Sequence, residues 1–414
     1  MRYRRLLAIV TIFLAMAGQA IGFEVRASIR MVNSEKRTAT VFANGRERTV
    51  RIAANATIQD ERGKNLSDGL NAKELTTGVT VTLTVEPEGG VPTIVSIRLG
   101  GAVDTSIRPL QTGQQSVGKA SVGFKPLTEM TAEDRYQGEG GGLYGGGSND
   151  PPAALAVAAN TVTAKIQPLD AEGKPAVAGK VVLVSISMSN ATQEFSRFKQ
   201  LADADPSKSP LVSIVDCAQG GQTMARWADP KAACWSEADR RLERENVSRK
   251  QVQVAWIKLA NAGPGGTLRE HGEQLERDTR AVLINLTRYF PNLRIAYLGS
   301  RIYGGYADGR LNPEPYAYEG AFVVRWLIQN QVNADADLNY DECRGEVRSP
   351  LLLWGPYFWA DGMTPRKSDG LVWERSDFVG DGTHPSDTGR QKVAIQLQRF
   401  FKTDTHAKTW FLKQ

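Results

Sequence analysis

Residues 24–100 alternate between apolar and polar positions in short runs, which is the pattern of antiparallel strands with one buried face. Turn residues such as Asn44 and Gly45 separate the runs. Five stretches share this pattern, at 25–32, 38–44, 48–53, 76–87 and 93–99. The alternation predicts a small all-β domain, an antiparallel barrel or sandwich, over residues 24–100.

From residue 179 the pattern changes to near-continuous apolar runs rich in branched residues, separated by amphipathic helical stretches. The runs lie at 180–187, 210–217, 251–259, 293–299 and 350–359, and the clearest helical stretches at 236–249, 272–290 and 388–401. This alternation predicts an α/β domain over residues 179–404, a five-stranded parallel sheet covered by helices in a three-layer α/β/α sandwich. Ligands of such sheets bind beyond the carboxyl ends of the strands, so functional residues should follow the strands directly.

Residues 101–178 differ from both domains because they are rich in Gly, Ser, Gln and Pro, with seven glycines within 138–147. Such a composition buries too little apolar area to form a core of its own. We interpret the segment as a linker containing one strand at 159–170. The alternative is that Leu143, Tyr144 and the glycines fold over the next domain as part of its rim.

The first 22 residues have the pattern of a secretory signal peptide, because Arg2, Arg4 and Arg5 precede an apolar run over residues 6–17. An uncleaved membrane anchor is the alternative, but the run is shorter than the about 18 residues that a spanning helix needs. The expected protein is therefore secreted or periplasmic, with no membrane span in the mature chain. At the other end, residues 405–414 are expected to form a short tail.

Charge and cysteine content narrow the possible partners. The formal net charge of +6 falls to +3 without the three signal arginines, and no Lys/Arg block carries interleaved aromatic residues, so nucleic acid is not an expected partner. Cys217 and Cys234 lie 17 positions apart and can form a disulfide in an oxidising compartment, but two buried thiols fit equally well. Cys343 has no obvious partner.

Candidate catalytic residues follow four of the five expected strands. Ser189 follows the first and is a candidate nucleophile, whereas Gly221 and Asn261 follow the second and third and can donate N–H groups to an oxyanion. Asp381 and His384 lie beyond the fifth strand, three positions apart, so the carboxylate can orient the imidazole. Each residue taken singly can serve as a helix cap or turn, but the set in this order predicts a serine hydrolase.

Residues 180–401, a little over half of the chain, resemble the SGNH hydrolases, also called the GDSL family of esterases and acetylhydrolases. The resemblance implies that the same five residues act as nucleophile, oxyanion donors, orienter and base, and that no metal or cofactor is needed. Several other block positions depart from the family pattern: Ser187 and Met188 before the nucleophile, Asp216 and Ala218 in the second block, and Leu259 and Ala262 in the third.

Three further segments offer candidate contacts. Arg301 and Tyr303 follow the fourth strand and are expected to contact a substrate. The aromatic run at 354–359 suggests a sugar platform, although an aromatic core is the better interpretation. Residues 335–346 have the oxygen spacing of a calcium loop, but Tyr340 stands where the turn needs Gly, which favours a solvated acidic loop.

The expected function is that of an exported serine esterase or O-acetylesterase acting on a small-molecule or glycan ester, such as an acetylated carbohydrate of the cell envelope. The alternative is an exported, non-catalytic protein that binds a glycan or another partner on the same scaffold, and Ser187 and Met188 are its best support. The N-terminal domain resembles the small OB-like β-barrel modules of exported bacterial proteins, which implies no particular ligand. Neither the ester nor the oligomeric state follows from the sequence.

Overall fold

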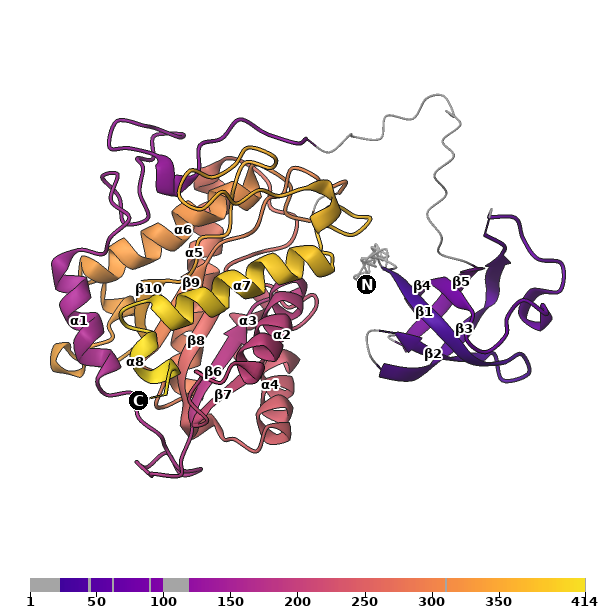
Figure 1. Cartoon of the computed structure of the whole chain (residues 1–414), viewed down its shortest axis with the longest axis horizontal. Coiled ribbons are helices and arrows are strands. Elements are labelled where there is room, and N and C mark those ends of the chain that lie inside the picture. The colour runs from indigo at the N-terminus through magenta and orange to yellow at the C-terminus, as the bar shows by residue number, and fades with distance from the viewer. Residues whose placement is uncertain are drawn as a thin grey trace, which may run out of the picture. The chain divides into compact units, whose positions relative to one another are not determined.

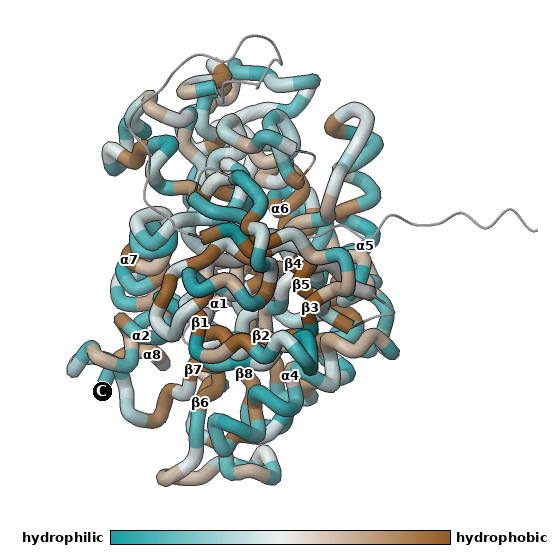
Figure 2. Tube along the Cα trace, turned by 90° about the vertical axis from the view of Figure 1, so that its right-hand side faces the viewer, coloured by the Kyte–Doolittle hydropathy of each residue, from teal (hydrophilic) through white to brown (hydrophobic). Residues whose placement is uncertain are grey.

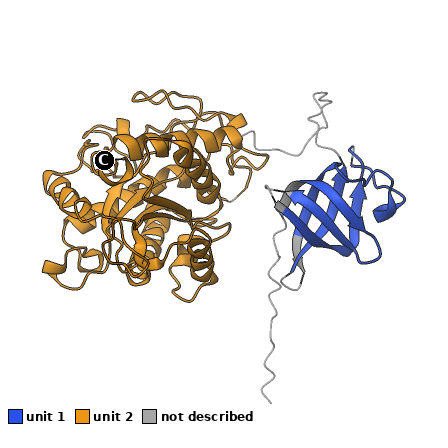
Figure 3. Cartoon of the chain, turned by 60° about the horizontal axis from the view of Figure 1, so that its bottom comes forward, with its two compact units in different colours: residues 1–112 blue, residues 113–414 orange. Residues whose placement is uncertain are grey.

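The computed structural model describes residues 23–43, 46–61, 63–88, 91–99, 119–309 and 311–413. The expected signal segment, residues 1–22, lies outside them. The chain divides into two compact units, residues 1–112 and residues 113–414 (Figures 1 and 3). Among the described helices, none combines the length and the apolar character needed to cross a bilayer.

The first unit is a closed five-stranded barrel with the strand order β1-β2-β3-β5-β4. Its strands are β1 (Phe23–Asn33), β2 (Thr38–Ala43), β3 (Arg46–Gln59), β4 (Thr80–Glu88) and β5 (Val91–Leu99). Alternate residues, among them Ile29, Val41, Leu83 and Ile97, fill its interior. The predicted barrel is confirmed except in one respect: β3 and β5 pair in parallel, whereas the other neighbouring strands are antiparallel as expected.

The second unit is built on a five-stranded sheet with the order β10-β9-β8-β6-β7, in which all neighbours run parallel. The strands are β6 (Val181–Ile186), β7 (Val212–Asp216), β8 (Val252–Lys258), β9 (Ile295–Gly299) and β10 (Leu351–Trp354). Every residue of β6, β8, β9 and β10 is buried, which explains why the sequence shows continuous apolar runs there. The predicted parallel sheet is confirmed.

Helices lie between the strands and after them. They are α1 (Ala153–Thr163), α2 (Ser189–Ala204), α3 (Met224–Trp227), α4 (Ala233–Arg244), α5 (Leu268–Tyr289), α6 (Tyr316–Val332), α7 (Asp387–Thr403) and α8 (Lys408–Phe411). Short 3-10 turns occur at Gly69–Asn71, Leu127–Glu129, Arg249–Gln251, Ala336–Leu338, Glu342–Arg344 and Arg375–Asp377. Apolar and hydrophilic residues alternate along α7, as expected of a helix with one buried face (Figure 2).

The strand order places helices on both faces of the sheet. Parallel strands are joined by right-handed crossovers, so α2, on the step from β6 to β7, lies on one face, and the helices of the reverse steps lie on the other. Contacts on the α2 face agree, because Phe195 of α2 stacks on Trp256 of β8. Tyr297, the register partner of Trp256, meets Phe401 of α7 on the same face. On the opposite face, α5 packs against α3 and α6.

The segment expected as a linker belongs largely to the second unit. Trp354 donates a hydrogen bond from its indole to the carbonyl of Leu143 at 2.7 Å, and the amide of Leu127 donates to the hydroxyl of Tyr357 at 3.1 Å. Residues 119–178 therefore follow the alternative interpretation, in which the Gly-rich stretch folds over the α/β domain. The remainder of the expected linker, up to residue 118, lies outside the described residues.

Two local expectations are wrong. The strand expected at 159–170 is replaced by the end of α1 and a turn, because the alanine-rich stretch over residues 153–159 favours a helix. The expected C-terminal tail instead forms α8, in which Phe411 is fully buried and stacks on Phe401. The sequence pattern missed α8 because four residues are too few to show helical periodicity.

Candidate active site

Ser189 is the first residue of helix α2, and a two-residue turn separates it from the end of β6. The two preceding residues hold this turn in place, because the hydroxyl of Ser187 donates to the carbonyl of Lys258 at 2.5 Å and Met188 is buried. Both positions depart from the family pattern, and both serve to pack the turn. The side chain of Ser189 remains partly exposed at the carboxyl end of the sheet.

The structure brings Ser189, His384 and Asp381 into one hydrogen-bonded chain. The Ser189 Oγ lies 2.8 Å from His384 Nε2, and His384 Nδ1 lies 2.5 Å from Asp381 Oδ2. Partial burial of Asp381 opposes its ionisation, but hydrogen bonds from the His384 ring and from the amides of His384 and Thr383 outweigh it and lower its pKa to about 2. An ionised Asp381 places the imidazole proton on Nδ1, which leaves Nε2 free to accept the serine proton.

The loop that carries Asp381 and His384 is fixed by close backbone packing. Gly382 has a φ of +65°, and a Cβ at this position would lie 1.7 Å from the carbonyl oxygen of Tyr306. The side-chain Nδ2 of Asn190 in α2 donates to the carbonyl of Thr383 at 2.9 Å. Only glycine therefore fits at position 382, and the loop is tied directly to the helix that begins at Ser189.

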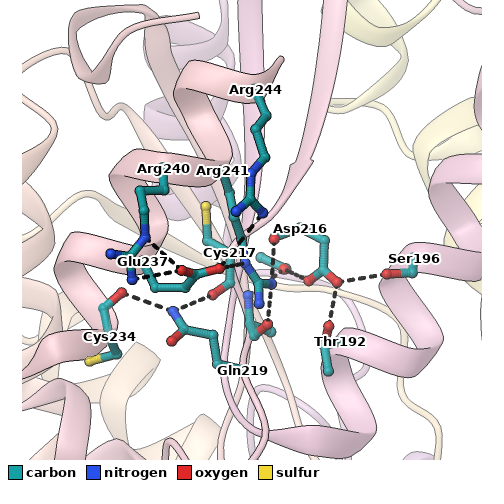
Figure 4. A network of polar contacts seen from close by, with 12 residues as sticks. Thr192, Ser196, Asp216, Cys217, Gln219, Cys234, Glu237, Arg240, Arg241 and Arg244 are labelled. Carbon is teal, nitrogen blue, oxygen red and sulfur yellow. Dashed lines mark hydrogen bonds and ion pairs between the residues drawn. The ribbon is translucent and has the colours of Figure 1, made fainter. Parts of the chain in front are cut away.

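A partly buried polar network anchors the loop after β7, which contains Gly221 (Figure 4). The carboxylate of Asp216 accepts hydrogen bonds from the hydroxyls of Ser185, Thr192 and Ser196, at 2.6, 2.5 and 2.7 Å. Burial raises the pKa of Asp216, and the three hydroxyl donors oppose this. The loop is thereby tied to both β6 and α2, which explains the role of an Asp at this position.

Gly221 itself has a φ of +74° and an exposed backbone, so it can present its N–H group to a ligand. The loop leading to it runs beside the turn that precedes the candidate nucleophile. The amide of Gln219 donates to the carbonyl of Ser187 at 3.0 Å, and the indole of Trp227 donates to the same oxygen at 3.2 Å. These two bonds bring the loops after β6 and β7 together.

Asn261, in the loop after β8, is held in one amide orientation. Its Oδ1 accepts from the amide of Ala225 at 3.0 Å, and its Nδ2 donates to Asp278 Oδ2 at 2.6 Å. An amide nitrogen has two hydrogens, and the second one finds no acceptor among the described residues. Asn261 can therefore donate one hydrogen bond to a ligand without losing its orientation.

The two residues after β9 behave differently from each other. Tyr303 is only 1% exposed, and its hydroxyl donates to the carbonyl of Lys119 at 2.5 Å. It is thus a core residue that anchors the start of the segment at 119–178, and its hydroxyl is already engaged there rather than free for the expected substrate contact. Arg301 is also buried, but it lines a small pocket together with Asn261.

The cysteines and the acidic loop are explained by packing. Cys217 and Cys234 are buried free thiols rather than a disulfide, and burial raises the pKa of both, that of Cys234 to about 11 (Figure 4). In the acidic loop, Asp335 pairs with Arg280 at 2.7 Å. Within the described ranges, no three His, Cys, Asp or Glu side chains gather as metal ligands would. The aromatic side chains Trp354, Tyr357, Phe358 and Trp359 are buried in the core.

Sequence reasoning missed three charged residues behind the site, of which two are fully buried and one partly buried. Lys258, at the end of β8, donates to both carboxylate oxygens of Glu194 in α2, at 2.7 and 2.5 Å. Glu314 is partly buried and accepts from the indole of Trp359 at 2.7 Å and from two backbone amides. The sequence contains one indication of the ion pair, a lysine inside the apolar run at 251–259, because a buried lysine needs a partner.

Glu314 is expected to make stability depend on pH. Burial raises its pKa to about 7, although its three N–H donors oppose the shift. The folded protein thus holds this proton more tightly than the unfolded chain does, so the stabilisation is lost as pH rises from about 4.5 to about 7. The loss should be about 3 kcal/mol. Urea unfolding at pH 5 and pH 8 measures it.

Glu314→Gln provides the comparison for this measurement, because a neutral amide has no proton to lose. The free energy of unfolding of the wild type should fall more steeply between the two pH values than that of the variant. Two parallel pH profiles would show that the Glu314 carboxyl titrates at its ordinary pKa.

Comparisons with known proteins give only remote likenesses. A scan against protein-family models finds no match, and a search of curated proteins finds none either. Among solved structures, the chain is similar to apo-CusF residues 6–88 from Escherichia coli, at 11% identity over 21% of this chain and 100% of that one, with a TM-score of 0.16.

Two further solved structures cover more of the chain. One is a proposed acylhydrolase from Bacteroides fragilis, at 12% identity over 60% of this chain and 97% of that one, with a TM-score of 0.32. The other is the periplasmic domain of a lipopolysaccharide acetyltransferase from Salmonella ser. Paratyphi A, at 13% identity over 54% and 84%, with a TM-score of 0.30. These values are too low to carry an argument about function, which depends on the site itself.

Proposed function

We propose that this chain is an exported serine hydrolase of the SGNH type that cleaves carboxylic esters. The observation that carries the proposal is the hydrogen-bonded chain from Ser189 through His384 to Asp381, with its two distances of 2.8 and 2.5 Å. A serine, an imidazole and a carboxylate in this order form the constellation that activates a hydroxyl for acyl transfer. The proposed substrate class is an O-acetylated carbohydrate or another ester of the cell envelope.

In the first half of the proposed reaction, the Ser189 Oγ attacks the ester carbonyl carbon while its proton passes to His384 Nε2. The carbonyl oxygen becomes an oxyanion, for which the amides of Ser189 and Gly221 and the free N–H of Asn261 are the proposed donors. The C–O bond to the alcohol then breaks, and His384 returns the proton to the leaving oxygen. The product is an acyl group on Ser189.

In the second half, water replaces the alcohol. His384 Nε2 takes a proton from the water, whose oxygen attacks the acyl carbonyl, and the same nitrogen then protonates the Ser189 oxygen as the acid leaves. Asp381 remains a carboxylate throughout and stabilises the imidazolium form of His384, in agreement with its low pKa. These steps require only the named groups and water.

The two departures from the family pattern before the nucleophile, Ser187 and Met188, are compatible with catalysis. Ser187 and Met188 face the interior, where they hold the turn, and they leave the hydroxyl of Ser189 free to meet His384. A binding protein without activity would need neither the contact between Ser189 and His384 nor the one between His384 and Asp381. The proposal therefore favours an enzyme over a binding module.

Labelling with a fluorophosphonate, which phosphonylates activated serines, tests the proposal directly. Mass spectrometry of the mature protein should locate the label on Ser189, and His384→Ala should abolish it because the hydroxyl loses its base. His406→Ala is the matched control, since His406 is a buried histidine whose ring pairs with no carboxylate among the described residues. Absence of label in the wild type, under conditions that modify a known serine esterase, would instead support the binding module.

A further inference from the structure

A small pocket adjoins the proposed active site, and half of the residues that line it carry hydrogen-bond donors while the other half are apolar. Asn261, His271, Arg301 and Asn312 all line it, with Tyr316 among the other contacts. Asn261 is shared with the proposed oxyanion site. The pocket therefore begins where the reacting carbonyl of a bound ester would lie, and it holds side chains that the proposed reaction does not use.

Two of these side chains are buried without a partner. Arg301 is 3% exposed, and the described part of the chain provides no ion pair or hydrogen bond for its guanidinium, including its buried Nε. Asn312 is 4% exposed, and its Nδ2 has no acceptor either. Buried donors without acceptors are rare in proteins because each one costs free energy. Two such donors in one pocket indicate that an acceptor from outside the chain completes them.

Nearby carboxylates do not supply this acceptor. Glu194 is bonded to Lys258 through both oxygens, and Glu314 accepts three N–H donors. Glu319, beside the pocket, binds His271 at 2.5 Å and also accepts from Tyr136 and Gln137. Burial lowers the pKa of Arg301 to about 10, so it stays protonated at neutral pH. The pocket thus presents a positive charge whose counter-ion is not within contact distance.

The pocket also lies close to the proposed catalytic histidine. Asn312 directly follows Leu311, whose carbonyl accepts from the hydroxyl of Thr383 at 3.1 Å, and Thr383 directly precedes His384. Arg301 lies two residues beyond the end of β9, at the carboxyl edge of the sheet where ligands of parallel sheets bind. A group bound in the pocket would therefore belong to the same molecule as the ester at Ser189.

We propose that this pocket binds a carboxylate of the substrate, with Arg301 and Asn312 as its donors, and that the enzyme prefers acidic esters. The inference rests on the proposed function. A planar guanidinium binds a planar carboxylate through two parallel hydrogen bonds, which suits a small pocket. The carboxylate can belong to the acyl half of the ester, as in a hemiester of a dicarboxylic acid, or to the alcohol half, as in an O-acetylated uronic acid.

Binding to Ser189→Ala tests the pocket separately from catalysis. Calorimetry should compare monomethyl succinate with dimethyl succinate for the acyl half, and O-acetylated glucuronic acid with O-acetylated glucose for the alcohol half. In one of the two pairs, the acid should bind at least about tenfold more tightly than the neutral ester, as expected of a charged hydrogen bond. The pair that shows the preference identifies the half that carries the carboxylate. Equal binding in both pairs would overturn the proposal.

Variants of the donors make the test specific. In the Ser189→Ala protein, a further Arg301→Gln substitution should abolish the preference. Arg226→Gln, which replaces an exposed arginine of α3, should leave it unchanged. Asn312→Asp keeps the size of the side chain and places a carboxylate beside Arg301, so it should also abolish the preference even if Arg301→Gln fails to fold. Retention of the preference in a folded Arg301→Gln or Asn312→Asp protein would contradict the assignment.

The two proposals fail in different ways. If Ser189 is not labelled by the fluorophosphonate but the acid preference is present and depends on Arg301, the pocket stands and the catalytic function does not. The opposite outcome is that Ser189 is labelled, the protein hydrolyses neutral and acidic esters equally well, and binding is equal in both pairs. In that case the catalytic function stands and the carboxylate pocket is wrong.

Discussion

Asp381→Asn is expected to lower the kcat for 4-nitrophenyl acetate by about 10⁴-fold without unfolding the protein. The amide can keep the two backbone hydrogen bonds that Asp381 Oδ1 accepts from Thr383 and His384, both at 2.9 Å. Its NH2 group would then face His384 Nδ1 and convert this nitrogen into an acceptor. The ring proton would move to Nε2, so the imidazole could no longer accept the proton of Ser189.

Steady-state kinetics with thermal unfolding of the same samples measures this effect. Asp387→Asn is the matched control, because the side chain of Asp387 is 98% exposed and pairs with Arg390, away from the proposed site. The control should retain the wild-type kcat. A kcat of Asp381→Asn within about tenfold of the wild type would show that the carboxylate does not set the tautomer of His384, and the proposed mechanism would then be wrong.

Lys258→Met is expected to destabilise the second unit by about 3 to 5 kcal/mol, because it leaves the carboxylate of Glu194 buried without its partner. Lys258 is 1% exposed and Glu194 is fully buried, so water cannot replace the lost hydrogen bonds. The double variant Lys258→Met, Glu194→Leu removes both charges together. It should recover most of the loss, since apolar residues of similar volume can replace a buried ion pair at little cost.

Urea unfolding of the full chain measures these changes through the transition of the second unit. Lys199→Met serves as the control, because Lys199 also pairs with a carboxylate, that of Asp203 at 2.8 Å. This pair lies on the surface of α2, the helix that also carries Glu194. The control should change the free energy of unfolding by less than about 1 kcal/mol. Similar losses for Lys258→Met and Lys199→Met would mean that the buried pair is accessible to solvent.

Much of the fold could be predicted from the sequence because its signals are local. Burial on both faces of a strand leaves a continuous apolar run, as in Val181–Ile186, and one buried face leaves alternation, as at Val81, Leu83 and Val85. The parallel pairing of β3 with β5 has no such signal, since residues such as Ile52 and Ile94 meet across the barrel closure. The Gly-rich segment was misread for the same reason: its partners lie in α6 and β10, far along the chain.

In the candidate site, too, the residues with local sequence signals could be predicted and those that depend on distant contacts could not. Asp381 and His384 could be recognised because they lie three positions apart, and Ser189 because it follows a strand. The isolation of Arg301 could not be foreseen, since it depends on what Glu194 and Glu314 already bind in the folded protein. The burial of Tyr303 could not be foreseen either, because its partner, the carbonyl of Lys119, belongs to a segment that composition marks as a linker.

The attachment of the segment at 119–178 has a consequence for the order of events during synthesis. Asp361 accepts hydrogen bonds from the amides of Val122 and Gly123, residues made nearly 240 positions earlier. Ribosomes add about 5 to 20 residues per second, so the segment must wait roughly 10 to 50 s before its acceptor exists. During that time Leu127, fully buried in the finished protein, has nothing to cover it. Docking of this segment is therefore expected to be a late step in folding, and the apolar residues that it carries are the ones a chaperone would meet first.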